Sequence, residues 1–242
     1  MTNAIETIEI LRNIHYNRKV RRMKMRIRCK PWAKVELAQS EFFVMEPEKF
    51  KGRWREFFKN DRNPIHLELG CGKGFFVKKA AKDNPEVNFV AVDLIDAILG
   101  MANRNIIEEF ENKEIPNIAL TRYDVEEINN IFDENDNIER IYINFCNPWP
   151  KPRHKKRRLT HTRQLEKYKK FLVPNGEIYF KTDDDDLITE SLEYFKEEGF
   201  EQVKVPYDLD KEPEFWNNIE TEHEIKFKND GIKIKAGIFR VK

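Results

Sequence analysis

Cysteine and long apolar runs are scarce in this sequence. Only three of its 242 residues are cysteines (Cys29, Cys71 and Cys146), and no two of them form a Cys-x-x-Cys pair. This scarcity argues against a disulfide framework or a cysteine-ligated metal and fits a reducing compartment. No apolar run reaches the length of a membrane span, and no signal-peptide pattern follows the N-terminus. We therefore expect a cytoplasmic protein without membrane or metal partners, as a monomer or a homodimer.

The chain also lacks a strong overall charge. It has 44 Lys and Arg residues against 43 Asp and Glu residues, for a formal net charge of +1, so any affinity for nucleic acid must be local. Residues 11–34 hold many basic residues and no acid, and a second basic run spans residues 151–158. Most charge runs are solvated surface, but here arginines lie near aromatic residues, which suits phosphate contacts and base stacking. These two runs favour an RNA partner.

Short apolar runs alternate with amphipathic stretches from residue 64 onward, which predicts a single α/β domain with helices on both faces of a mostly parallel sheet. Strands are expected at Ile65–Leu69, Val87–Val92, Asn117–Thr121, Ile138–Phe145, Glu177–Lys181, Gln202–Pro206 and Ile232–Val241. Helices are expected at Gly74–Lys82, Leu94–Asn112, Thr162–Val173 and Asp184–Glu198, with only a long loop between the last two strands. We assign residues 51–242 to this domain and residues 1–50 to a basic, partly disordered N-terminal extension.

A glycine-rich segment follows the first strand and leads directly into a helix. It reads Glu68-Leu69-Gly70-Cys71-Gly72-Lys73-Gly74. Glycines at alternate positions permit positive φ and let a ligand approach the backbone closely. A dinucleotide fingerprint needs G-x-G-x-x-G, and Phe75 occupies the place of its third glycine, which argues against a nicotinamide oxidoreductase. The plain alternative is a tight turn between strand and helix that binds nothing.

The spacing E-x-G-x-G-x-G resembles the first motif of class I S-adenosylmethionine-dependent methyltransferases. Their Rossmann-like fold has a seven-stranded, mostly parallel sheet with an antiparallel last strand, and we expect that architecture here. The resemblance implies that Glu68 lies near the methionine part of S-adenosylmethionine, beside the three glycines. Asp93, at the end of the next strand, suits the ribose hydroxyls, and Asp124, after the third strand, suits the adenine amino group. Either aspartate alone is equally well explained as a helix cap, but three elements in order favour the cofactor.

The most specific segment follows the fourth strand. It reads Cys146-Asn147-Pro148-Trp149-Pro150-Lys151-Pro152-Arg153-His154-Lys155-Lys156-Arg157-Arg158-Leu159-Thr160. Prolines that flank a tryptophan fix a rigid loop at the edge of the sheet where α/β folds bind ligands. The segment resembles that of bacterial tRNA (guanine-N7-)-methyltransferases, which usually read N-F-x-D-P-W-P-K-x-R-H-x-K-R-R-L-T. Three further segments agree with that family: Lys30-Pro31-Trp32-Ala33, Phe180-Lys181-Thr182-Asp183 and Thr221-Glu222-His223-Glu224.

This resemblance, which extends from about Arg22 to the C-terminus, implies methyl transfer from S-adenosylmethionine to N7 of guanosine 46 in the tRNA variable loop. Substrate contacts are implied for Lys151, Asp183, Thr221, Glu222, His223 and Glu224. Contacts to the RNA backbone are implied for Arg153, His154, Lys156, Arg157 and Arg158. The residues themselves leave alternatives open: Asp183 also suits a helix N-cap or a solvated first turn, and residues 221–224 suit a helix start or a loop.

One position departs from the family pattern. Asn147 stands where the family usually carries an aspartate credited with an active-site role, and an amide cannot accept a proton at ordinary pH. Guanine N7 carries a lone pair and no hydrogen, so attack on a sulfonium methyl requires alignment rather than proton removal. We therefore place Asn147 in the catalytic and cofactor-binding site as the residue that orients the base or the amino-acid part of the cofactor.

Two other functions remain compatible with these motifs. Asn147-Pro148-Trp149 also resembles the Asn-Pro-Pro-aromatic motif of exocyclic-amine methyltransferases that act on adenine or cytosine, although the basic run that follows argues against them. A non-catalytic RNA-binding relative that keeps the cofactor fold is the second alternative. Cys146 lacks the Pro-Cys context of a pyrimidine-methylating nucleophile, so we interpret it as a packing residue.

Overall fold

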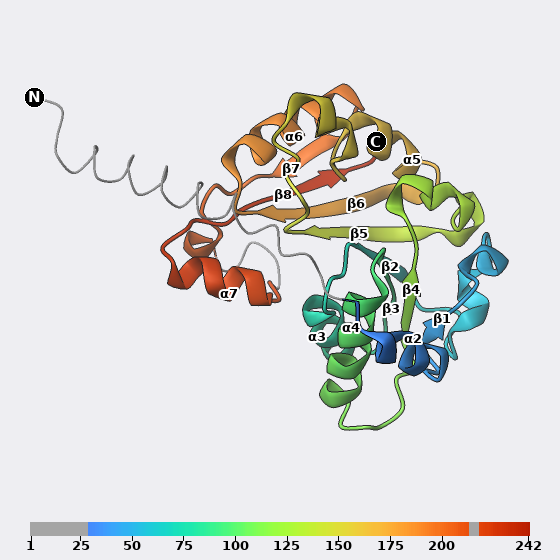
Figure 1. The fold of residues 1–242 in the computed structure, drawn as a ribbon. Coiled ribbons are helices and arrows are strands. Elements are labelled where there is room, and N and C mark those ends of the chain that lie inside the picture. Colours follow the sequence, from blue (N-terminus) through green and yellow to red (C-terminus); the bar gives the residue numbers. More distant parts are fainter. Residues whose placement is uncertain (1–28, 213–217) are drawn as a thin grey trace, which may run out of the picture.

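The computed structural model describes residues 29–212 and 218–242, and its centre is an eight-stranded sheet with the order β1-β4-β3-β2-β5-β6-β8-β7 (Figure 1). The strands are β1 (Phe43–Val44), β2 (Ile65–Leu69), β3 (Asn88–Asp93), β4 (Ile118–Arg122), β5 (Ile138–Asn144), β6 (Leu172–Thr182), β7 (Glu201–Lys204) and β8 (Lys235–Arg240). β1 to β6 pair in parallel, whereas β8 lies antiparallel between β6 and β7.

Helices cover both faces of the sheet. One layer contains α2 (Pro31–Ala38), α3 (Phe75–Asp83) and α4 (Asp96–Glu109), and the other contains α5 (Thr162–Tyr168) and α6 (Asp185–Glu197) (Figure 1). Side chains of β3 alternate between these layers, as the pleat of a strand requires. Val90 and Val92 join the core with α5 and α6, whereas Phe89 and Ala91 join the core with α3 and α4. Burial on both faces explains why residues 89–92 of this strand are all apolar.

The predicted Rossmann-like architecture of class I methyltransferases, with an antiparallel last strand, is confirmed, but the sheet has eight strands instead of seven. The additional strand is β1, whose residue Phe43 pairs with Leu120 and Val44 with Thr121. Two residues are too few to produce a periodic pattern in a sequence. The helix predicted over Thr162–Val173 ends at Tyr168, because the chain enters β6 at Leu172, opposite Ile138 of β5.

An additional helix, α7 (Glu222–Asn229), lies between the last two strands, where the sequence predicts only a loop. Its sequence EHEIKFKN has no clear apolar stripe, so periodicity does not reveal it. Short 3-10 helices complete the described elements at Pro47–Phe50, Trp54–Phe57, Val125–Asn130, Glu134–Asp136, Pro152–Arg157 and Leu209–Lys211. No helix in the described part of the chain has the length and apolarity needed to cross a membrane.

Part of the predicted N-terminal extension is built into the domain. α2 packs on α4, where the guanidinium of Arg104 lies 3.6 Å from the centroid of the Trp32 ring and also pairs with Glu36. Gly100 allows this close approach, since a Cβ at that position would lie 2.5 Å from the Cβ of Ala33. Residues 31–38 therefore belong to the folded layer. The disorder predicted for part of the extension stays a prediction, because residues 1–28 lie outside the described residues.

The contact between α2 and α4 predicts the effect of Gly100→Ala. Helix propensity alone would stabilise α4 by about 1 kcal/mol, but the clash with Ala33 should outweigh it and lower the free energy of unfolding by about 1–3 kcal/mol. Urea unfolding measures the change, with Glu108→Ala on the exposed face of α4 as the control. A Gly100→Ala variant more stable than the unchanged chain would show that α2 does not pack here.

Candidate active site

The glycine-rich loop leaves β2 and enters α3 in a left-handed conformation. Gly70, Gly72 and Gly74 have φ of 75°, 55° and 73°, values that residues with a Cβ rarely adopt. The amides of Gly70 and Cys71 both donate to the carbonyl of Val92, which holds the loop against the end of β3. The loop therefore has the shape that the alternating glycines predict.

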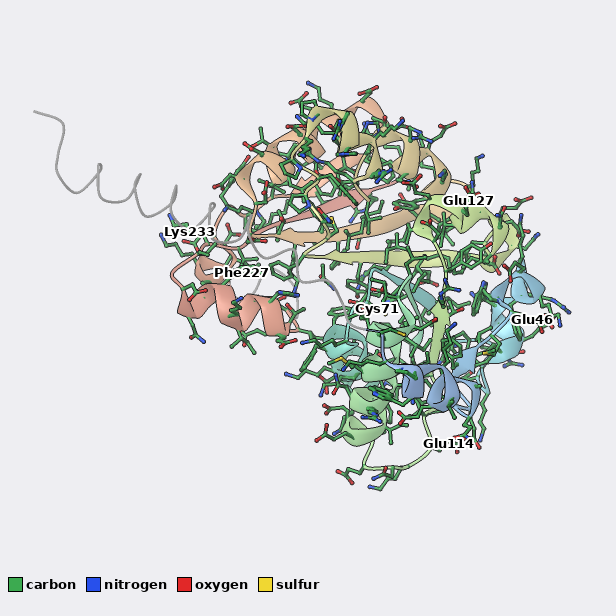
Figure 2. The ribbon with its side chains drawn as sticks, viewed as in Figure 1. Glu46, Cys71, Glu114, Glu127, Phe227 and Lys233 are labelled. Carbon is green, nitrogen blue, oxygen red and sulfur yellow. The ribbon has the colours of Figure 1, made fainter. Side chains whose placement is uncertain are left out.

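A cleft of about 260 Å³ lies between this loop and the start of α7. Figure 2 labels Cys71 in the loop and Phe227 on α7, the two elements on either side of the cleft. Lys73 and Glu222 connect them, because Nζ of Lys73 lies 2.9 Å from Oε2 of Glu222 although the two residues are 149 positions apart. Predicted site residues that line the cleft are Glu68, Gly70, Gly72, Thr221, Glu222 and His223.

Glu68 is the buried acid of this cleft. It is only 2% exposed, and Nδ2 of Asn144 donates to its Oε1 at 3.2 Å. Its Oε2 has no hydrogen-bond partner among the described residues. Burial raises the pKa of Glu68 to about 8, against smaller opposing effects of Asn144 and Lys181. A cationic ligand fits this carboxyl, because a positive charge would supply the missing partner and stabilise the ionised form.

Asp93 and Asp124 lie at the ends of β3 and β4. Asp93 accepts from the amide of Gly72 at 3.0 Å and from the amide of Ile95 at 3.1 Å, so it braces the glycine loop. Asp124 is exposed, and its Oδ1 accepts from the amide of Glu126 at 2.9 Å as the N-cap of a 3-10 helix. The helix-cap interpretation is therefore confirmed for Asp124. Contacts of either aspartate to a cofactor stay a prediction.

The loop after β5 has a strained backbone. Phe145 and Trp149 have φ of 52° and 40°, although both carry bulky side chains. Between them, Oδ1 of Asn147 accepts from the amide of Trp149 at 3.0 Å and closes a local turn. Asn147 is exposed and does not belong to the residues that line the cleft. Its oxygen thus shapes the loop itself.

Arg158 is buried beneath this loop, although the sequence places it in the RNA-binding run. It is 1% exposed, its Nε donates to the carbonyl of Pro148 at 2.7 Å, and its Nη1 lies 2.8 Å from Oε2 of Glu190 on α6. A guanidinium without exposed surface does not reach a phosphate, so the assignment of Arg158 to the RNA backbone is corrected. The remaining predicted contacts are exposed or half-buried: Lys151, Arg153, His154, Lys156 and Arg157.

Residues 221–224 begin α7. Oγ1 of Thr221 accepts from the amide of Glu224 at 3.2 Å and caps the helix, which confirms the helix-start interpretation. Glu224 is fully buried, and its Oε2 lies 2.8 Å from Nζ of Lys181. This burial corrects the predicted substrate contact of Glu224, whose carboxylate supports the helix from within. The ring of His223 lies beside that of Phe145, with centroids 6.0 Å apart, at the cleft wall.

Asp184, and not Asp183, caps α6, since its Oδ1 accepts from the amide of Leu187 at 2.7 Å. The N-cap interpretation of Asp183 is therefore wrong. Burial raises the pKa of Asp183, and the charges of nearby Lys235 and His223 oppose this shift. Its proximity to His223 keeps Asp183 a candidate for contact with the substrate.

Lys181 and Asn144 are two residues of the site to which the sequence analysis assigns no role. They lie side by side on β6 and β5. Nζ of Lys181 donates to Oδ1 of Asn218 and to the carbonyl of Ile219, each at 3.0 Å, in addition to Glu224. A lysine inside an apolar strand is the signal that points to Lys181, because a buried ammonium requires such partners. Asn144 carries no comparable signal.

Known proteins are similar in sequence to this chain over most of its length. A family model described as a putative methyltransferase matches residues 62–236. The tRNA (guanine-N(7)-)-methyltransferase of Clostridium beijerinckii is 54% identical over 213 residues, which cover 87% of this chain and 96% of that protein. The protein of the same description from Clostridium perfringens (strain 13) is 55% identical, over 87% of this chain and 97% of that protein.

Solved structures share the fold at much lower sequence identity. The 16S rRNA methyltransferase KamB matches with a TM-score of 0.55 at 12% identity, over 74% of this chain and 88% of that chain. TrmN from Thermus thermophilus matches with a TM-score of 0.52 at 19% identity, over 75% of this chain and 46% of that chain. Likeness at these identities shows the fold alone, which is that of methyltransferases.

Buried Glu68 predicts a pH-dependent stability. Its pKa of about 8 in the folded chain exceeds the ordinary value of 4.5, so its contribution is fully present below pH 4.5 and is lost as pH rises toward 8. We expect Glu68→Gln to lie within about 1 kcal/mol of the unchanged chain at pH 5 and to exceed its free energy of unfolding at pH 8.5 by about 4–5 kcal/mol. Urea unfolding at the two pH values measures this difference. An equal difference at both pH values would contradict the raised pKa.

Proposed function

The chain belongs to the tRNA (guanine-N7-)-methyltransferase family, and from this membership we propose how its cleft holds the methyl donor and which guanosine it modifies. The enzyme transfers a methyl group to N7 of a guanine in tRNA. The observation that carries the proposal is the buried carboxyl of Glu68, which has one unpartnered oxygen in a cleft next to the strained loop after β5.

Glu68, the glycine loop, Asp93 and Asp124 are the residues that fit the donor. S-adenosylmethionine, when bound, supplies an electrophilic methyl group on a positively charged sulfur. Glu68 would face its cationic methionine part, because a positive charge gives the unpartnered Oε2 a partner. Each carboxylate oxygen of Asp93 accepts one backbone bond and keeps a lone pair for a ribose hydroxyl. Asp124, one strand further along the sheet edge, would reach the adenine.

Alignment is the main task of the protein on the substrate side. N7 of guanine attacks through a lone pair and loses no proton, so no general base is needed. Asn147 acts by holding Trp149 in the turn that presents the loop to the purine. An aspartate at this position would make the same bond through Oδ1, so the departure from the family pattern leaves the turn intact. Asp183 would accept hydrogen bonds from the purine and stabilise the positive charge that grows on it.

The exposed basic residues after this loop provide the grip on tRNA. Arg153, Lys156 and Arg157 are exposed, and the guanidinium of Arg157 lies 5.3 Å from the centroid of the Trp149 ring. In this arrangement a cation that suits a phosphate lies beside an aromatic ring that suits stacking on a base. We place the target at guanosine 46 in the variable loop and the enzyme in the cytoplasm, where tRNA is modified.

The target position is tested by incubating the protein with labelled S-adenosylmethionine and bulk unmodified tRNA. We expect label in N7-methylguanosine and strand scission by aniline at position 46. Nucleoside digestion provides the control for the rival reactions. Label in methylated adenine or cytosine would support an exocyclic-amine methyltransferase, and absence of label would support a non-catalytic RNA-binding protein.

The loop role of Asn147 is tested with two substitutions. Asn147→Asp keeps the bond to Trp149, so we expect turnover within a few-fold of the unchanged enzyme. Asn147→Ala removes the bond, and misalignment of the purine should lower kcat by about 10–100-fold while the KM for the donor changes little. Steady-state kinetics on tRNA transcript measure both variants. Full turnover by Asn147→Ala would rule out this role.

A further inference from the structure

We propose that Arg158 is a positioning residue that holds the loop after β5 against α6, and that it does not bind RNA. The inference rests on the proposed function in one respect, namely that residues 147–150 hold the purine in position. The carbonyl of Pro148 lies between two residues in strained conformations, and the Arg158 guanidinium connects that carbonyl to Glu190.

The contacts of Arg158 leave it no surface for a phosphate. Its side chain is 1% exposed. The guanidinium donates hydrogen bonds to two acceptors at once. Nε donates to the Pro148 carbonyl at 2.7 Å, and Nη1 donates to Oε2 of Glu190 at 2.8 Å. Only the planar fork of arginine provides two fixed donors in this geometry, because a lysine ammonium is a single point of charge.

Glu190 connects Arg158 to α6, the helix on which Glu190 lies. Its Oε1 also accepts from Lys155 at 2.5 Å, and its Oε2 accepts from the hydroxyl of Tyr194 at 3.1 Å. Desolvation acts to raise the pKa of Glu190, but the bond from Lys155 and the charge of Arg158 outweigh it and hold the pKa below its ordinary value. Glu190 is therefore ionised at neutral pH and attracts both cations toward α6.

The backbone of the loop explains why such an anchor is needed. Left-handed φ values at Phe145 and Trp149 are maintained only where surrounding contacts outweigh their strain. Pro148 has no amide hydrogen, so its carbonyl is the one backbone group through which it can form a hydrogen bond. Nε of Arg158 donates to that carbonyl, while Oδ1 of Asn147 accepts from the amide of Trp149 and closes the turn. Together the two hydrogen bonds determine the position of residues 147–150.

A nearby residue provides a matched comparison. Lys156 and Arg158 are two positions apart in the same basic run, yet Lys156 is exposed and Arg158 is buried. Removal of a cation that contacts phosphate lowers the slope of log Kd against log salt by about one. Removal of a buried cation leaves this slope unchanged. The salt slope therefore separates the two roles.

The experiment compares Arg158→Met, Glu190→Gln and the control Lys156→Met. For the first two we expect kcat to fall by about 10–100-fold, with the Kd for tRNA within twofold and the salt slope unchanged. Lys156→Met should instead weaken tRNA binding and lower the slope. Arg158→Lys should recover only part of the lost kcat. If Arg158→Met does not fold, Glu190→Gln provides the test, because it keeps the size of the side chain and removes the charge that attracts Arg158.

A second measurement does not depend on activity. Incorporation of 5-fluorotryptophan labels all four tryptophans, and Trp149→Phe assigns the resonance of Trp149. Loss of the Arg158 contact should shift or broaden the Trp149 resonance and leave that of buried Trp54 in place. A smaller salt slope for Arg158→Met, an unchanged kcat or an unmoved Trp149 resonance would overturn the proposal. Absence of N7 methylation by the unchanged enzyme would refute the proposed function, whereas the resonance would still test the anchor.

Discussion

The site depends on one constraint, the position of β2 in the middle of a parallel sheet. β3 pairs with one side of β2 and β5 with the other, so the chain order reverses at this strand. Parallel strands bring their carboxyl ends to one edge, and the reversal leaves a crevice there because the following segments depart in opposite directions. The glycine loop, Asp93, the loop after β5 and Asp183 all gather at that edge, although they come from four different strands.

Two ion pairs, each with a buried cation, hold elements that flank the cleft to this frame. Lys181 and Glu224 join β6 to α7, and Arg158 and Glu190 join the loop after β5 to α6. A buried pair contributes little net stability compared with apolar side chains, because desolvation of the charges offsets their attraction. Its effect is geometric, since both partners are satisfied in one arrangement only. In this enzyme each pair supports an element that flanks the cleft.

Strong local patterns allowed much of the fold to be predicted. The bounds of β2 are those predicted, and α3 and α6 each differ by one residue at both ends, because their apolar periodicity and flanking residues are clear. The two elements that the sequence did not predict have a common cause. β1 is two residues long, and α7 depends on the Thr221 cap and on Lys181 rather than on an apolar stripe. Such elements form through contacts with distant parts of the chain, which a single sequence does not display.

The sequence by itself determined the fold class, the glycine loop and the identity of the loop after β5, because φ preferences, spacing and periodicity are local properties. Only the tertiary structure decided what each polar residue of these motifs does. Asp183 and Asp184 are adjacent and chemically identical, yet Asp184 caps a helix whereas Asp183 does not and instead interacts with the charges of Lys235 and His223. Arg157 and Arg158 carry the same charge, yet one faces solvent and the other is buried. The difference depends on which acceptors lie within reach, and Pro148 and Glu190 come within reach of Arg158 only after the chain has folded.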